Sequence, residues 1–297
     1  MDPDAILDRR RLKRRLIFWR VFAALAVMAL LAVGIGKFVT RSDSHIARLS
    51  INGFIAEDRE RGDAIDKLVV EDDVAAVIVR INSPGGTTTG SEQIYYGLRR
   101  VAAQKPVVAV IGTIGTSGGY IVAIGADHII ARDTSLTGSI GVLFQTAEFT
   151  GLMNKLGIKP LTFKSTPLKG QPSPVEPLTN EAQKALAELL EDSFDWFSSL
   201  VQQRRELGET ALKAATDGRV FSGRQAVKLN LIDAIGGERA ARKWLEAKHD
   251  IADDLPTRNV HWGDKAGLIA RALDSIGGKL FKNERLTLDG LLAVWQP

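Results

Sequence analysis

The strongest constraint on the fold is a pair of apolar segments that each end in a glycine-rich turn and continue into a helical pattern. Residues 74–81 are apolar except for Arg80, which is typical of a strand buried on both faces of a parallel sheet. They end in Ser-Pro-Gly-Gly at 83–86, and a second such strand, at residues 105–112, leads to Gly-Thr-Ser-Gly-Gly at 115–119. This alternation of strand, turn and helix predicts an α/β fold with a mostly parallel sheet. In such folds, active sites gather where strands end in turns.

Other segments fit the same class of fold. Residues 46–55 and 128–133 predict strands, and the pair Thr89 and Glu92 predicts a capping box at the start of a helix. Residues 159–177 contain five prolines and predict an irregular loop. Further helices are predicted at residues 118–127, at 186–201, where apolar side chains form a stripe, and after Ser222, which is placed to cap a short helix.

Ser117 stands between glycines at the second of the two turns. Glycine costs backbone entropy and adds no packing, so it is usual where another backbone or a ligand comes close. A serine at a helix N-terminus also has free N–H groups beside it, which can stabilise an oxyanion. The motif therefore predicts a nucleophile with half of its oxyanion hole, although a plain tight turn would use the same glycines.

A serine nucleophile needs a base, and the residues leave three alternatives open. A histidine base would make residues 115–119 the nucleophile elbow of an α/β-hydrolase, with Asp233 and a late histidine, His249 or His261, as partners. A glycine-lined site without a base would stabilise a thioester enolate, as in the crotonases. A lysine acts as a base when burial lowers the pKa of its amine. The lysines of the irregular region are Lys155, Lys159, Lys164 and Lys169.

The N-terminal region predicts a membrane anchor. Residues 16–36 form an apolar run long enough to cross a bilayer if Arg20 reaches back to the headgroups. Residues 1–20 hold seven basic and three acidic side chains, and a basic block before a span favours a cytoplasmic N-terminus. We therefore expect a cytoplasmic segment at 1–15, a transmembrane helix at 16–36 and the remaining chain on the exported side. The alternative is a cleaved signal peptide with its apolar core at residues 21–33.

The composition excludes several classes of function. The 297-residue chain has no cysteine, which rules out disulfides and thiolate metal sites, and its four histidines do not stand at metal-ligand spacing. Basic and acidic side chains balance outside the first 20 residues, so the net charge of +4 belongs to the N-terminal block. We therefore expect no metal, no cofactor and no nucleic-acid partner.

Five motifs together resemble the signal peptide peptidase A (SppA) family of membrane-anchored serine proteases, in its short, single-domain form. They follow one another between residues 51 and 237 as INSPGG, TSGGYIVAIGAD, LTGSIGV, FKSTPLKG and DGRVFSGRQAVKLNLID. The resemblance implies a Clp protease/crotonase-like fold, in which helices flank a mostly parallel sheet. The chain departs from many relatives at Thr116 and Val122, which affects the shape of the pocket and not the proposed chemistry.

The resemblance also implies the site residues. Ser117 matches the nucleophile and Lys169 its general base, which together make a Ser–Lys dyad. Ser139 matches the serine that orients the lysine amine, and Gly86 and the N–H of Gly118 match the oxyanion hole. The short members of the family form rings in which the serine and the lysine meet across a subunit boundary. The resemblance therefore implies a homo-oligomer with shared active sites.

These observations lead to one functional hypothesis and two alternatives. We expect an endopeptidase of the bacterial inner membrane that degrades remnant signal peptides on the exported side. Its peptidase domain would span residues 45–247 and its C-terminal tail 248–297, with the bilayer and peptides as partners. The alternatives are an α/β-hydrolase-type esterase that uses Ser117 with a late histidine, and a catalytically inactive membrane scaffold of the same fold.

Overall fold

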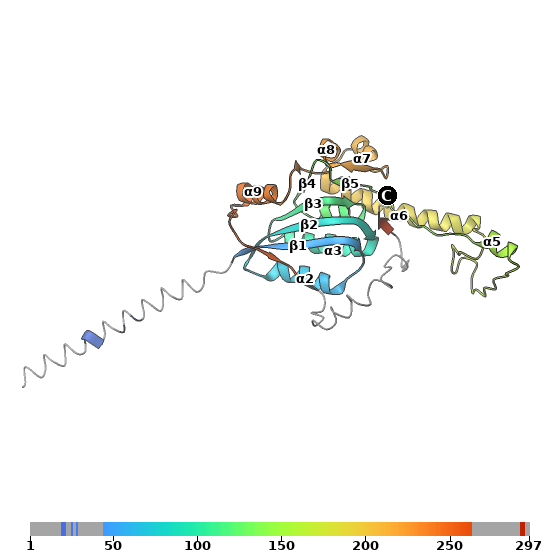
Figure 1. Ribbon diagram of the computed structural model, residues 1–297, viewed down its shortest axis with the longest axis horizontal. Coiled ribbons are helices and arrows are strands. Elements are labelled where there is room, and N and C mark those ends of the chain that lie inside the picture. Colours follow the sequence, from blue (N-terminus) through green and yellow to red (C-terminus); the bar gives the residue numbers. More distant parts are fainter. Residues whose placement is uncertain (1–18, 22–24, 26–27, 29–43, 263–291, 295–297) are drawn as a thin grey trace, which may run out of the picture. The chain divides into compact units, whose positions relative to one another are not determined.

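The computed structural model describes residues 19–21, 25, 28, 44–262 and 292–294. The chain divides after Ser44 into two units, and the elements described below belong to the second (Figure 1). They are β1 (His45–Ile55), α2 (Arg59–Val70), β2 (Val74–Thr87), α3 (Thr88–Ala102), β3 (Val107–Thr116), α4 (Gly118–Ile124), β4 (His128–Ala131), β5 (Leu136–Gly138), α5 (Thr150–Lys155), α6 (Asn180–Arg205), α7 (Glu209–Ala215), β6 (Val220–Ser222), α8 (Gly223–Lys228), β7 (Ala234–Ile235), α9 (Glu238–His249), β8 (Thr257–Asn259) and β9 (Leu292–Val294).

The nine strands of the described residues form one sheet. Its main path runs β6-β5-β3-β2-β1-β8, while β4 pairs with β3 and β7, and β9 pairs with β2. The pairs are parallel except for β5 with β6 and β2 with β9. The predicted α/β fold with a mostly parallel sheet is therefore confirmed. Strands β8 and β9, which come from residues 248–297, take part in this same sheet.

The central strand β2 is buried on both faces, as its apolar run predicts. Val77, Val79 and Ile81 pack in the larger core cluster, which also contains side chains of α3 and α4. Ala76 and Ile78 point to the other face and pack in a second cluster with side chains of α9. Because successive side chains of a strand alternate between faces, burial on both sides requires an apolar run instead of alternating polarity.

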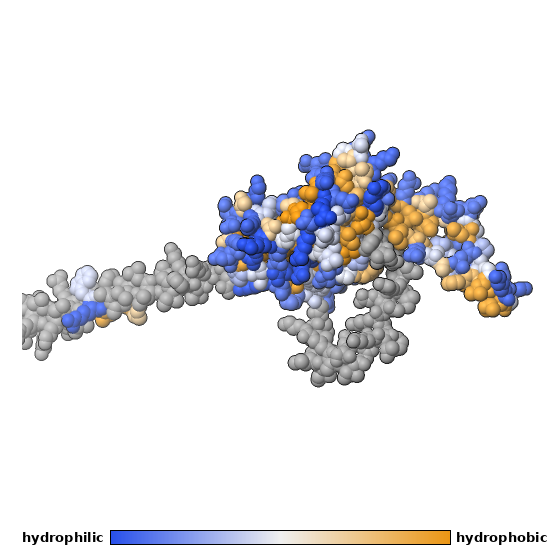
Figure 2. All heavy atoms as spheres, turned by 45° about the horizontal axis from the view of Figure 1, so that its top comes forward, coloured by the Kyte–Doolittle hydropathy of each residue, from blue (hydrophilic) through white to orange (hydrophobic). Residues whose placement is uncertain are grey.

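Helix α6 packs against α4 with its C-terminal half and extends away from it with its N-terminal half. Phe197, Leu200 and Val201 are buried in the larger core cluster. The preceding part of α6, with α5 and the loop between them, extends from the sheet; we call residues 150–192 the arm (Figure 1). Only the C-terminal half of the predicted apolar stripe is therefore buried. In the other half, Leu189 is 50% exposed. Figure 2 shows apolar surface on this region, where the large exposed side chains are Leu152, Leu156, Ile158, Leu161, Phe163, Leu168, Leu178 and Leu189.

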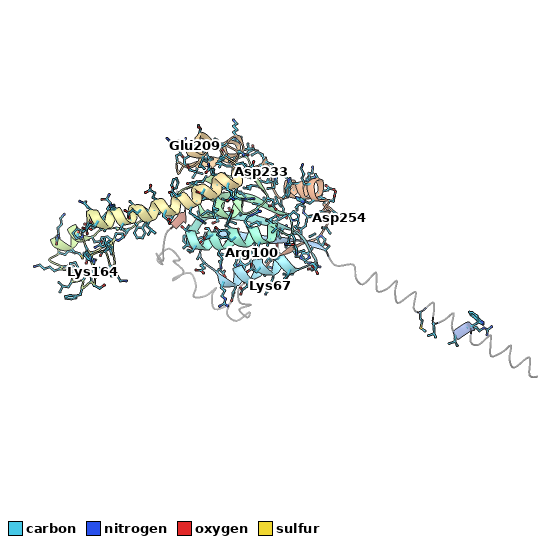
Figure 3. The ribbon with its side chains drawn as sticks, turned by 180° about the vertical axis from the view of Figure 1, so that it is seen from behind. Lys67, Arg100, Lys164, Glu209, Asp233 and Asp254 are labelled. Carbon is cyan, nitrogen blue, oxygen red and sulfur yellow. The ribbon has the colours of Figure 1, made fainter. Side chains whose placement is uncertain are left out.

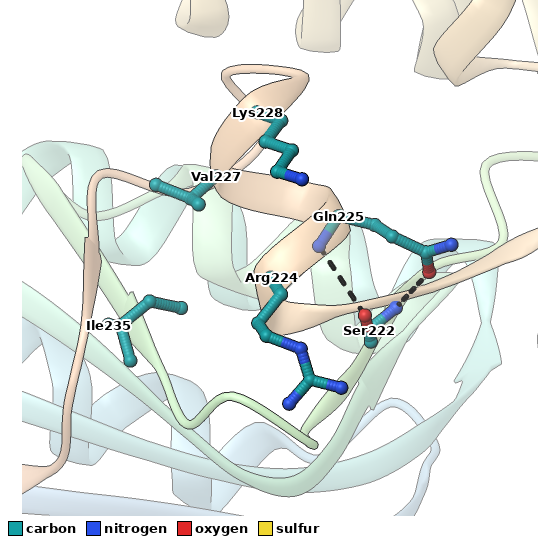
Figure 4. A pocket seen from close by; sticks show the side chains of 6 residues that line it. All are labelled: Ser222, Arg224, Gln225, Val227, Lys228 and Ile235. Atoms are coloured by element: carbon teal, nitrogen blue, oxygen red, sulfur yellow. Dashed lines mark hydrogen bonds between the residues drawn. The ribbon is translucent and has the colours of Figure 1, made fainter.

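Side-chain caps fix where the helices begin. Helix α3 starts after Thr87, whose Oγ1 accepts the N–H of Gly90 at 3.1 Å. The predicted capping box of Thr89 and Glu92 is wrong, because both residues lie inside α3 and the threonine two positions earlier takes the cap. Ser222 caps α8 as predicted: its hydroxyl accepts the N–H of Gln225, whose side chain accepts the N–H of Ser222. Figure 4 shows this capping box at a shallow surface pocket beside α8.

In the described part of the chain, no helix combines the length and the apolar character that a bilayer span requires. The predicted transmembrane helix at 16–36 and the cytoplasmic segment at 1–15 fall almost wholly outside the described residues. Both therefore stay predictions.

Burial on helix α2 leads to a stability prediction. Ile65 is 1% exposed and packs against α3, whereas Val70 on the same helix is 75% exposed. Replacing Ile65 by Ala should lower the free energy of unfolding by about 2–5 kcal/mol, because it removes buried methyl groups and leaves a cavity. Val70→Ala, the control, should change it by less than about 0.5 kcal/mol. Urea unfolding measures both, and equal losses would contradict this packing.

Candidate active site

The two glycine turns lie against each other at the ends of β2 and β3. Ser83 pairs with Gly115 across the two strands, and the hydroxyl of Thr116 donates to the carbonyl of Pro84 at 3.2 Å. A Cβ at Gly119 would stand 2.9 Å from the carbonyl oxygen of Ser83, so this contact favours glycine. The sequence pattern predicted that both turns fall at equivalent ends of two parallel strands, and the structure confirms it.

Ser117 forms the corner between β3 and α4. It is 1% exposed, and its backbone has φ 52° and ψ −117°, which is costly for a residue other than glycine. The corner is held by the Ser117 N–H, which donates to the carbonyl of Gly138 at 2.7 Å. The Ser117 hydroxyl makes one long contact, 3.5 Å to the carbonyl of Gly141, so it remains available for chemistry. Gly118 begins α4, and the first N–H groups of a helix have no carbonyl partner inside it.

Ser139 stands next to this corner. It directly follows Gly138, the residue that accepts the Ser117 N–H, and Gly138 pairs with Thr116 across β5 and β3. Ser139 is buried and also has a positive φ, 50°, with its N–H donating to the carbonyl of Arg219 at 2.8 Å. The structure therefore brings Ser139 to the neighbourhood of Ser117.

Gly86 lies on the part of β2 that continues past β3. It pairs with Ile55 of β1, and a Cβ at Gly86 would stand 1.9 Å from the carbonyl oxygen of Ile55. No side chain fits in that space, so the close approach of β1 accounts for the glycine. Gly85 before it has a φ of 110°, a conformation that also favours glycine.

Strand β9 occupies the edge of β2 that β3 leaves free. Beyond the Ser83–Gly115 pair, β3 no longer follows β2, because the chain turns at Ser117 into α4. The backbone of residues 292–294 runs antiparallel along this vacated edge, with Gly86 opposite Ala293, and it also contacts α4. A segment of the chain therefore lies as an extended peptide between the glycine strand and the helix that begins after Ser117.

Within one chain, the predicted base, Lys169, lies on the arm and away from Ser117. In Figure 3, Lys164 labels the arm at the far end of α6, whereas Asp233 lies by the opposite end of α6, near the sheet. Lys169 is exposed and ends a turn in the same loop, where its N–H donates to the carbonyl of Thr166. Within one chain, the structure brings together Ser117, Gly118, Ser139 and Gly86, but not Lys169.

Lys164, in the same loop, is another candidate for the general base. It forms an ion pair with Glu176. The hydrogen bond from Lys164 holds the pKa of the Glu176 carboxyl below its ordinary value. The Lys164 amine is therefore engaged by a carboxylate of its own loop.

The late histidines do not complete a triad with Ser117. Asp233 accepts the Ile129 N–H at 2.6 Å and pairs with Arg205 at 2.7 Å, so both of its oxygens have structural partners. His249 packs on the edge of Trp244, with ring centroids 4.8 Å apart, and His261 lies by the β1–β8 edge of the sheet. Among the described residues, no imidazole contacts the Ser117 hydroxyl, and no group of acidic and histidine side chains is arranged to hold a metal ion.

A family model and several relatives name the same kind of enzyme, a peptidase. The model of Peptidase family S49 matches residues 99–252. A candidate protease of Synechocystis sp. is 38% identical over 212 residues, covering 71% of this chain and 76% of that protein. A candidate signal peptide peptidase SppA of Enterococcus faecium is 30% identical (71% and 66% covered), and Protease 4 of Haemophilus influenzae is 33% identical (75% and 38% covered). The chain thus spans less than two thirds of the last two relatives. It belongs to peptidase family S49, and it is a serine peptidase.

Proposed function

We propose that this chain is a membrane-anchored endopeptidase with a Ser–Lys dyad, in which Ser117 is the nucleophile and Lys169 of a neighbouring subunit is the general base. The observation that carries the proposal is strand β9, whose backbone pairs with Gly85–Thr87 beside the nucleophile helix. Peptides commonly bind by adding a strand to a free sheet edge, where backbone hydrogen bonds accept many sequences. The site therefore suits an extended polypeptide better than a small ester.

In this proposal the corner supplies the nucleophile and the oxyanion donors of acyl transfer, and the neighbouring chain supplies the base. The Ser117 Oγ attacks the peptide carbonyl while the neutral amine of Lys169 takes its proton, and the N–H groups of Gly86 and Gly118 stabilise the oxyanion. The Lys169 ammonium, oriented by Ser139, then gives its proton to the leaving amine, so that an acyl-enzyme and a free amine remain. A water molecule, deprotonated by the same lysine, cleaves the ester and restores the Ser117 hydroxyl.

The shared site follows from the arm. Lys169 lies on a loop that extends from its own sheet, and the arm exposes large apolar side chains, including Phe163 at 94%. An exposed apolar surface of this kind marks an interaction site. A head-to-tail contact, repeated around a closed ring of Clp protease/crotonase-like protomers, would cover the arm and bring each lysine to the serine of the next chain.

The substrates and the location follow from the N-terminal sequence and the relatives. The basic block and the apolar run at 16–36 would anchor the chain in a bacterial inner membrane, with the peptidase on the exported side. One relative bears the name of a signal peptide peptidase. Signal peptides left in the bilayer after cleavage are apolar and close to such an anchor, and we propose them as the substrates.

The dyad predicts that Ser117→Ala and Lys169→Ala each reduce peptide hydrolysis by at least about 10³-fold, with no further loss in the double variant. Circular dichroism and size-exclusion chromatography should match the wild type. Lys164→Ala, the control on the same loop, should keep activity within a few-fold, since Lys164 is paired with Glu176. Activity that survives Lys169→Ala but not His261→Ala would favour the hydrolase alternative, and an inert wild type would favour the scaffold.

The shared site predicts complementation between two dead variants. Co-expressed Ser117→Ala and Lys169→Ala chains, purified through two different tags, should regain activity, because some junctions pair an intact serine with an intact lysine. At equal ratios about a quarter of the junctions in a closed ring are intact. Mixed assemblies that contain both chains and remain inactive would place the dyad within one chain.

The position of β9 predicts that the C-terminal segment competes with substrate. Deleting residues 263–297 should lower the KM for a peptide several-fold and leave kcat unchanged, because an attached strand acts at a high effective concentration. Ala293→Pro should act in the same direction in the full-length chain, since proline removes a backbone N–H from the pairing. A KM that neither change alters would show that substrate does not use this edge.

A further inference from the structure

Helix α4, which carries Ser117 at its start, is held at its other end by the arm helix α6. Arg204 of α6 donates from Nε to the carbonyl of Ile124 and from a terminal nitrogen to that of Ala126, both at 2.9 Å. These are the last carbonyls of α4 and of the turn after it, which no residue of the helix satisfies. A guanidinium there meets two acceptors at once and lies at the favourable end of the helix dipole.

A second link joins the same two helices through a turn. The hydroxyl of Tyr120, one helical turn after Ser117, donates to the carbonyl of Leu231 at 2.7 Å. That turn is fixed by Arg205 of α6, which donates to the carbonyl of Asn230 at 2.7 Å and pairs with Asp233. Tyr120 is fully buried, and burial raises the pKa of its phenol, which favours the protonated hydroxyl that donates this bond.

The short length of α4 makes these links important. It has seven residues, all buried, so few hydrogen bonds inside the helix define its axis. Its direction decides where the Ser117 Oγ and the Gly118 N–H point, and displacements of about 1 Å in an active site can reduce a rate by about 10²-fold. The two ends of α6 therefore lie at different sites: one holds α4, and the other continues into the loop of Lys169, about 39 Å away along a 26-residue helix.

We propose that Arg204 and Tyr120 are positioning residues for the nucleophile, and that through them α6 links the Ser117 of its own chain to the arm that reaches the neighbouring chain. Neither residue touches the reacting atoms. Arg204 sets the end of α4 directly, and Tyr120 sets its first turn through the segment that Arg205 holds. This inference rests on the proposed Ser–Lys peptidase and gives a role to Tyr120, which lies in one of the family motifs, and to Arg204, which lies outside them.

The first test removes the Tyr120 hydroxyl and keeps its ring. Tyr120→Phe should lower kcat about tenfold with KM within twofold of the wild type, counted per active site titrated with an uncharged serine-reactive probe. Amide hydrogen exchange in residues 118–125 should become faster. Tyr96→Phe is the control: its side chain is 45% exposed and its hydroxyl makes no hydrogen bond within the described part of the chain, so kcat and exchange should not change.

Arg204 provides an independent pair of variants in case Tyr120→Phe folds poorly. Arg204→Met should reduce kcat per titrated site about tenfold, and Arg204→Lys should recover part of it, since the ammonium keeps the charge and one hydrogen bond. If these variants only lower the melting temperature, with kcat per site and exchange in α4 unchanged, the positioning role is wrong and the peptidase proposal stands. If the wild type neither hydrolyses peptides nor reacts at Ser117, the peptidase proposal itself fails, and the positioning role of Arg204 and Tyr120, which rests on it, fails too.

Discussion

The left-handed backbone at Ser117 is the constraint on which the rest of the site depends. A chain that turns from β3 into α4 within one residue must leave the path of the sheet at once, and the hydrogen bond from Ser117 N–H to the Gly138 carbonyl stabilises this turn. Strand β5 is therefore needed beside β3, because it supplies that carbonyl and places Ser139 next to it. The cost of the positive φ is of order 1–3 kcal/mol, which a buried, fully packed corner can offset.

The same turn creates the edge on which a peptide can lie. Because β3 departs at Ser117, the last residues of β2 keep β1 on one side and lose their neighbour on the other. The glycines there serve this arrangement: Gly86 allows β1 to approach, and Gly85 adopts a conformation that few other residues tolerate. In this chain residues 292–294 fill the edge. The corner at Ser117, the start of α4 and the edge that residues 292–294 fill are thus three consequences of one change of direction in the backbone.

The sequence predicted the fold and the corner because both depend on local patterns. Burial on both faces of β2 requires an apolar run, and the close contacts at Gly86 and Gly119 require glycine. Both features can therefore be recognised in the sequence alone. The start of α3 was misplaced by two residues, since several adjacent threonines compete for one cap. The pairing of β9 with β2 and the bond from Tyr120 to Leu231, 111 positions away, join segments far apart in sequence, and no local pattern specifies such partners.

Lys169 and the membrane anchor stay predictions for two different reasons. The anchor lies almost wholly outside the described residues, whereas the lysine is described but lies on an arm that no other described part of its own chain covers. The N-terminal half of the apolar stripe on α6 is partly exposed among the described residues. The C-terminal half of the helix is buried and holds α4 through Arg204. Exposed apolar surface and the contact that holds α4 therefore lie along one helix. The contact that we propose between the arm and a neighbouring chain would therefore involve the same helix that holds α4 through Arg204.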